Sequence, residues 1–133
     1  MEDVLQRFPK GEIQAVFTHN DNTAFGALKA IEAAGRGEEG ILIVGIDGEN
    51  RAIRAVADGK LAATFTYSTV APQGVIAAYA LVKGDMATLD TLGTVTKAED
   101  GSVSIEIPSQ LITKANAAEF FCKGLGDDPE CPQ

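Results

Sequence analysis

The sequence predicts an α/β fold in which a parallel β-sheet with flanking helices is followed by a C-terminal β-hairpin region. Short apolar runs typical of strands alternate with stretches of helical periodicity, in the order βαβαβα. The connections between them are short, which favours right-handed crossovers and parallel strands. Residues 41–46 are almost all branched and apolar, as expected of a parallel strand that is covered on both faces.

The first strand and helix occupy the N-terminal part of the chain. Residues 13–18 form a short apolar run that predicts a strand, and the polar residues 19–22 end it. Apolar residues then recur at helical spacing up to Gly35, a residue that commonly terminates helices. The sequence places the N-cap of this helix at Asp21 or Asn22.

The same pattern is repeated twice. Residues 41–46 predict the second strand, and a helix is expected after it, closing at Gly59. Residues 61–67 predict the third strand, followed by a helix over residues 73–83. The clearest boundary in the chain lies near residues 66–72, where the third strand ends.

The remaining residues differ in character from this repeated pattern. Residues 94–96 and 103–107 alternate between apolar and polar side chains, and they flank a Glu-Asp-Gly turn signal at residues 99–101. This arrangement predicts a β-hairpin. A last short helix is expected over residues 116–121.

Composition excludes several functional classes. The 133 residues include 11 basic and 19 acidic side chains, giving a formal net charge of −8, which disfavours binding to nucleic acid or anionic lipid. No apolar run approaches the ~20 residues that a membrane-spanning helix needs. Residues 1–8 have neither a basic start nor an apolar core, so no signal peptide is expected there. The length by itself suits one compact domain.

Polar residues stand at the ends of all three predicted strands. Asn20 and Asp21 follow the first strand, Asp47 follows the second, and Tyr67 ends the third. Because ligands of open parallel sheets bind beyond the carboxyl ends of the strands, these side chains are the candidate binding residues. A carboxylate accepts hydrogen bonds from two hydroxyls, an amide donates and accepts, and a tyrosine offers a flat apolar face. This set suits a neutral sugar or polyol.

Each of these residues also has a purely structural interpretation. Asp21 is better explained as a helix N-cap than as a ligand contact. Asn20 and Asp47 can be turn residues that bond to nearby backbone. Tyr67 fits a half-buried strand aromatic, which is the simpler explanation from the residues alone, and His19 fits a loop position.

Enzymatic chemistry lacks its usual residues. No G-x-G-x-x-G stands directly between the first strand and the helix that follows it, and the motifs G-x-x-x-x-G-K-[ST] and G-x-S-x-G are absent. His19 is the only histidine, and the two cysteines, Cys122 and Cys131, both lie in the C-terminal tail. We therefore expect no catalytic residue, no metal site and no cofactor. Whether the cysteines form a local disulfide or remain thiols stays open, because this depends on the redox compartment.

Four segments resemble the sugar-binding proteins of bacterial ABC transporters, the ribose/galactofuranose-type (type I) periplasmic binding proteins. Residues 15–28 are similar to the family's AVFxxNDxxAxGAL segment, and residues 43–48 to its VVGxDG segment. Residues 55–64 match AVxDGKLAAT, and residues 111–116 resemble LITKEN. The motifs occur in the order and spacing of the family and cover most of residues 4–118.

The resemblance implies that Asn20 and Asp47 hydrogen-bond the hydroxyls of a monosaccharide. Ribose-type members carry glutamine where Tyr67 stands, so a ribose ligand is in doubt and the role of Tyr67 is carried over less directly. The resemblance also implies a periplasmic protein that binds sugar between two lobes and serves the membrane permease of an ABC transporter.

The resemblance further implies that this chain corresponds to the last part of such a protein. Residues 1–67 are then a partial C-terminal lobe of Rossmann-like architecture, residues 68–118 a crossover segment belonging mainly to the other lobe, and residues 119–133 a tail. Residues 1–8 resemble a helix that precedes the first strand. Because part of a parallel sheet exposes strand edges and apolar faces, we expect a homo-oligomer with weak sugar affinity.

Two alternatives remain at this point. The first is the effector-binding domain of a LacI-type repressor, which shares the fold. Such a repressor would need a basic helix-turn-helix segment upstream. In addition, residues 37–40 lack the proline that usually leads into the second strand of these repressors. The second is a small α/β enzyme that uses Asp47 with His19 or Asp21.

Overall fold

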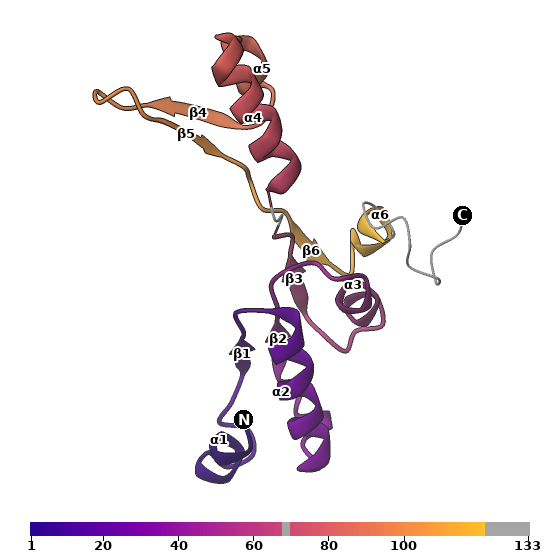
Figure 1. The fold of residues 1–133 in the computed structure, drawn as a ribbon. Coiled ribbons are helices and arrows are strands. Elements are labelled where there is room, and N and C mark those ends of the chain that lie inside the picture. Colours follow the sequence, from indigo (N-terminus) through magenta and orange to yellow (C-terminus); the bar gives the residue numbers. More distant parts are fainter. Residues whose placement is uncertain (68–69, 122–133) are drawn as a thin grey trace. The chain divides into compact units, whose positions relative to one another are not determined.

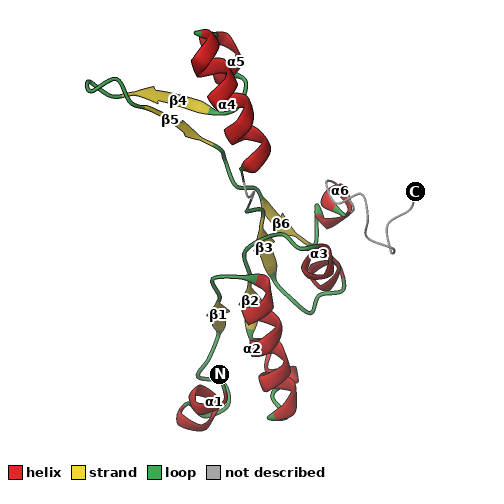
Figure 2. Ribbon diagram, viewed as in Figure 1, coloured by secondary structure: helices red, strands yellow, loops and turns green. Residues whose placement is uncertain are grey.

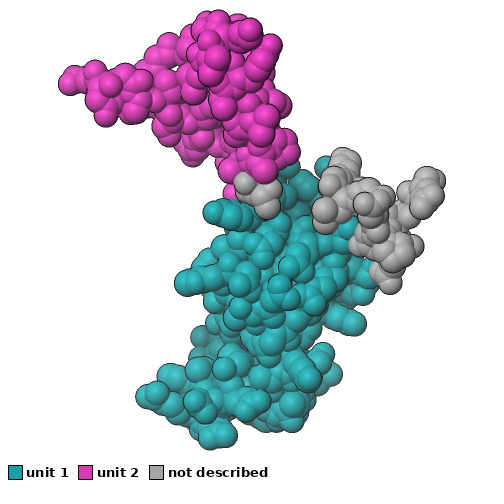
Figure 3. Space-filling model, viewed as in Figure 1, with its two compact units in different colours: residues 1–67, 110–133 teal, residues 68–109 magenta. Residues whose placement is uncertain are grey.

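The computed structural model describes residues 1–67 and 70–121, and the chain divides into two compact units. Unit 1 comprises residues 1–67 and 110–133, and unit 2 comprises residues 68–109 (Figure 1, Figure 3). Cys122 and Cys131 lie outside the described residues, as does most of the tail predicted for residues 119–133. None of the described helices is long and apolar enough to span a membrane.

Unit 1 contains a four-stranded sheet with helices around it (Figure 2). Its elements in chain order are α1 (Glu2–Arg7), β1 (Ala15–Phe17), α2 (Asp21–Ala33), the 3₁₀ turn η1 (Gly37–Glu39), β2 (Leu42–Val44), α3 (Asn50–Ala57), β3 (Ala63–Phe65), β6 (Leu111–Thr113) and α6 (Ala117–Phe120). The strand order is β1-β2-β3-β6. Strands β1, β2 and β3 are parallel, which confirms the predicted α/β fold, whereas β6 is antiparallel to β3 and makes the sheet mixed.

Strand β6 brings residues 110–121 back into unit 1. The family resemblance implies that residues 68–118 belong mainly to another lobe, but the last part of that range completes the sheet here. The physical reason is that the backbone groups on the edge of β3 away from β2 need hydrogen-bond partners, which this segment supplies. Directly after β3, Thr66 donates its N–H to the Gln110 carbonyl at 2.9 Å, and the Gln110 N–H donates to the Thr66 hydroxyl at 2.8 Å. The lobe assignment for the rest of the range stays a prediction.

The core of unit 1 lies on one face of the sheet. The register aligns Val16 with Ile43 and Thr64 with Ile112, so these side chains share a face. They pack against α2, α3 and α6 in a cluster whose buried members include Ala24, Ile31, Ile53, Val56, Leu61 and Ala117.

The opposite face of the sheet exposes large apolar side chains. Phe17, Leu42 and Leu111 are 62%, 57% and 47% exposed. The expectation that strand 41–46 is covered on both faces is therefore wrong within the described chain. The reason is that α2, α3 and α6 all pack against the other face.

A buried arginine fixes the N-terminal helix. Arg36 is 4% exposed, and its guanidinium donates at 2.8–3.0 Å to the carbonyl of Leu5 in α1 and to the carbonyls of Phe8 and Pro9 directly after the helix. It also forms a two-point ion pair with Glu39 at 2.6 and 2.9 Å. The Arg36 hydrogen bond lowers the pKa of Glu39 to about 2, so this pair stays charged down to low pH.

Unit 2 combines two helices with a hairpin. It contains α4 (Ala71–Lys83), α5 (Met86–Asp90), β4 (Thr94–Lys97) and β5 (Val103–Glu106). The antiparallel pairing of β4 with β5 confirms the predicted hairpin, and Gly101 supplies the positive φ of +85° at its turn. Helix α5 is not predicted, because its five residues are too few to show a periodicity.

Candidate functional site

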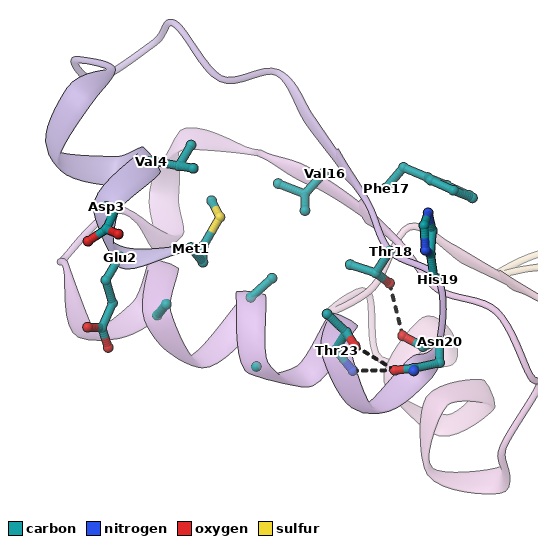
Figure 4. Close-up of a pocket in the computed structure, with 13 residues that line it drawn as sticks. Met1, Glu2, Asp3, Val4, Val16, Phe17, Thr18, His19, Asn20 and Thr23 are labelled. Carbon is teal, nitrogen blue, oxygen red and sulfur yellow. Dashed lines mark hydrogen bonds between the residues drawn. The ribbon is translucent and has the colours of Figure 1, made fainter.

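Asn20 follows β1 and caps α2. Its side-chain Oδ1 accepts hydrogen bonds from the Thr23 backbone N–H at 2.8 Å and from the Thr23 hydroxyl at 2.7 Å (Figure 4). The predicted N-cap at Asp21 or Asn22 is therefore wrong by one or two positions. Because the amide oxygen is held by Thr23, the orientation of the side chain is fixed. Its Nδ2 group donates no hydrogen bond within the described residues and can donate to a ligand.

Asp47 follows β2 in a strained backbone conformation. Its φ of +125° lies in a region that L-residues rarely adopt, at a cost of about 1–3 kcal/mol. The neighbouring strand holds it there: the Asp47 N–H donates to the Phe65 carbonyl at 2.9 Å, and the Asp47 carbonyl accepts from the Tyr67 N–H at 3.2 Å. Within residues 1–67 and 70–121 the Asp47 carboxylate accepts no hydrogen bond, so it is free for a ligand.

Tyr67 lies two residues beyond the end of β3. Its backbone is tied to Asp47, while its side chain is 68% exposed. The interpretation of Tyr67 as a half-buried strand aromatic is therefore wrong for this chain. Its backbone contact brings Tyr67 and Asp47 to the same edge of the sheet, as the strand-end argument predicts.

Asp21 is buried and unavailable to solvent. As the first residue of α2 it has no exposed surface, and its Oδ1 accepts from the Thr64 hydroxyl at 2.7 Å. Its Oδ2 accepts from the Glu49 backbone N–H at 2.9 Å. Burial raises the pKa of the Asp21 carboxyl, although the hydrogen bond from Thr64 works against that shift. Asp21 is neither an N-cap nor an accessible ligand contact here.

Asp21 links the Asn20 region to the Asp47 region. It directly follows Asn20 in the chain, and its carboxylate reaches Glu49, two residues after Asp47. No hydrogen bond joins the side chains of Asn20, Asp47 and Tyr67 to one another among the described residues. This network is not predicted from the sequence; its signal is Thr64, a polar residue within an otherwise apolar strand.

A pocket of about 930 Å³ lies beside the free edge of β1 (Figure 4). Residues of α1, β1 and α2 line it, among them Asn20 and His19, but neither Asp47 nor Tyr67 does. It is therefore the space next to the edge of β1 that no described strand pairs with, and of the three strand-end residues only Asn20 lines it. His19 is exposed, with its ring edge-on to that of Phe17, and the described residues contain no group of three His, Cys, Asp or Glu suited to a metal ion.

The model of the periplasmic binding protein domain matches residues 1–85. The chain belongs to the periplasmic binding protein family. The strand-end residues Asn20, Asp47 and Tyr67 all lie within the matched part of this periplasmic binding protein.

Individual relatives of this periplasmic binding protein are named for the small molecules that they bind. It is 41% identical over 78 residues to the ribose import binding protein of Haemophilus influenzae, covering 57% of this chain and 26% of that one. It is 38% identical over 109 residues to a putative rhizopine-binding protein of Rhizobium meliloti, covering 82% and 31% of the two chains. The chain thus spans about a quarter to a third of the length of these relatives.

Solved structures agree with this assignment. The arabinose-transporter periplasmic binding protein of Shewanella sp. ANA-3, solved with bound arabinofuranose, superposes with a TM-score of 0.65 at 29% identity. The match covers 90% of this chain and 36% of that one. The fold of this chain is therefore that of part of a type I periplasmic binding protein, as the sequence motifs indicate.

Proposed function

We propose that the chain is part of the solute-binding component of a sugar ABC transporter and binds a neutral monosaccharide or polyol without chemical conversion. The observation that carries this proposal is Asp47. A residue that served only to turn the chain at a φ of +125° would be best as glycine, which adopts such angles without strain. An aspartate with a free carboxylate is useful there for binding a ligand.

The proposed contacts follow from the chemistry of the three side chains. The Asp47 carboxylate accepts hydrogen bonds from two sugar hydroxyls, and the oriented Asn20 amide donates to another. Tyr67 packs its exposed ring against a sugar face. Each hydrogen bond to the charged group contributes about 1.5–3 kcal/mol once water is excluded.

The cellular setting is proposed from the relatives. Proteins of this family named as import binding proteins support a periplasmic location, a transport role in place of catalysis, and delivery of sugar to the membrane permease by the full-length protein. They also favour this role over the repressor and enzyme alternatives. Because the matches cover only 26% and 31% of the relatives' own length, further contacts with the sugar are expected from outside this chain, whose own affinity is accordingly weak.

The test of this proposal is a titration of the 133-residue chain with D-ribose, L-arabinose, D-fructose and myo-inositol, followed by NMR. We expect saturable shifts at the amides of residues 20 and 47–49 with at least one of the four. The substitutions Asn20→Ala and Asp47→Asn should each weaken that affinity by tenfold or more, because each removes a directed hydrogen bond. Asp58→Asn, at an exposed position after α3, is the matched control. Absence of shifts with all four compounds contradicts the proposal for this chain.

The exposed sheet face of unit 1 supports the further proposal that the isolated chain is a homo-oligomer. Phe17 and Leu42 expose more than half of their surface beside the unpaired edge of β1, a combination that favours association. Light scattering is expected to give a mass above the 13.9 kDa of one chain, and Phe17→Ser with Leu42→Ser should lower it. Glu32→Ser, an exposed change on α2, should have no such effect. A wild-type mass of one chain at all concentrations excludes the oligomer.

A further inference from the structure

The buried carboxylate of Asp21 has no part in the contacts proposed above. It has no exposed surface, and burying a charge is costly unless hydrogen bonds compensate for it. Both of its oxygen atoms are satisfied by groups that come from elsewhere in the chain, Thr64 in β3 and Glu49 at the start of α3. An ordinary helix start would not need a buried charge, since Asn20 already caps α2.

The hydrogen bonds around Asp21 all lead to its carboxylate, which acts only as an acceptor. The Gly48 backbone N–H donates to the Thr64 hydroxyl oxygen at 3.3 Å, and the Thr64 hydroxyl donates to Asp21 Oδ1 at 2.7 Å. The Glu49 N–H donates to Asp21 Oδ2 at 2.9 Å. Two donors therefore converge on one side chain, and a carboxylate is the group that offers acceptors on both of its atoms.

These bonds hold the residues that directly follow Asp47. Gly48 is reached through Thr64, and Glu49 is reached directly. On the other side of Asp47, the backbone of Gly45 packs against the same carboxylate. A Cβ atom at Gly45 would lie 2.2 Å from Asp21 Oδ1, so there is no room for a side chain at this position. The segment on either side of the strained Asp47 is therefore shaped around Asp21.

We propose that Asp21 is a positioning residue. It fixes residues 45–49 in the conformation that presents Asp47, and it sets the position of this segment relative to Asn20. This inference rests on the proposed function, since the value of that conformation is the presentation of Asp47 to a sugar. Asp21 itself does not touch the ligand. It acts through the backbone of Gly48 and Glu49.

The first test needs no ligand. In the 133-residue chain, Asp21→Asn offers one acceptor where two donors converge, so the Glu49 N–H or the Thr64 hydroxyl loses its partner. We expect hydrogen exchange of the Gly48 and Glu49 amides to accelerate by tenfold or more, relative to the Ile43 and Val56 amides in the core. Unchanged relative exchange overturns the proposal.

The second test is a double-mutant cycle on sugar affinity, measured with D-ribose, L-arabinose, D-fructose and myo-inositol. Asp21→Asn alone should weaken binding by tenfold or more. Added to Asp47→Asn, it should cost less than twofold further, because its effect passes through Asp47. A purely structural role gives additive losses, and additive losses overturn the proposal.

Two further variants separate the remaining outcomes. If Asp21→Asn does not fold, Thr64→Val and Thr64→Ser are measured in its place. Thr64→Val removes the hydroxyl and should accelerate hydrogen exchange of the Gly48 amide by severalfold, whereas Thr64→Ser keeps a hydroxyl and should keep exchange slow. Equal exchange rates in the two variants overturn the proposal. If no sugar binds the wild-type chain, or Asp47→Asn binds like wild type, the proposed function fails. The exchange measurement then decides the positioning role by itself.

Discussion

Replacing Asp47 with glycine is expected to raise the stability of unit 1 and at the same time to abolish sugar binding. The φ of +125° costs an aspartate about 1–3 kcal/mol, and glycine removes this strain. Glycine also adds about 0.5–1 kcal/mol of chain entropy to the unfolded state. The net expected gain in the free energy of unfolding is about 1 kcal/mol, or ~4–8 °C in Tm for a domain of this size, measurable by thermal and urea denaturation.

The matched control for this prediction is Asp47→Ala. Alanine also lacks the carboxylate but keeps the Cβ atom, so it should lose sugar binding without gaining stability. An equal gain in both variants would mean that the strain is not the cause. Retained sugar affinity in Asp47→Gly would mean that the carboxylate does not contact the ligand.

Ile112→Ala is expected to destabilise unit 1 by about 2–5 kcal/mol, the usual cost of truncating a fully buried isoleucine. Ile112 has no exposed surface and belongs to the main core, although it lies 45 positions after Tyr67, where the first segment of unit 1 ends. The loss should be visible as a lower midpoint of urea denaturation.

Leu111→Ala, one position away, is the control for this core substitution. Its side chain is 47% exposed on the opposite face of the sheet, so we expect a loss of about 1 kcal/mol or less. Equal losses at the two positions would contradict the placement of β6 in the sheet with Ile112 facing the core.

The parallel part of the fold could be predicted because its signals are local. Residues 13–18, 41–46 and 61–67 are apolar runs followed by polar breaks, and the structure has β1, β2 and β3 inside these ranges. Strand β6 could not be predicted in this way. Only Leu111 and Ile112 form an apolar run there, which is shorter than the runs around β1, β2 and β3, and its partner β3 lies more than 40 residues earlier in the chain.

The helix cap illustrates a second limit of local information. The sequence predicts the cap at Asp21 or Asn22, but Asn20 is an equally good N-cap residue, so sequence alone does not rank the three. The choice depends on Thr64, which offers a buried hydroxyl to Asp21 and leaves the capping role to Asn20. In the same way, nothing local to Asp47 indicates its strained φ, because the backbone of residues 65–67 holds it in place.

The sequence by itself determined the α/β class, the alternation of parallel strands and helices along the chain, the family resemblance, and the placement of Asn20, Asp47 and Tyr67 at strand ends. These features depend on short-range periodicity and on the rule that parallel strands share one carboxyl edge. The tertiary structure alone decided the pairing of β6, the cap at Asn20, the burial of Asp21 and the strain at Asp47. Each of these depends on contacts between residues far apart in the chain, and the energies of such contacts cannot be inferred from a local sequence pattern.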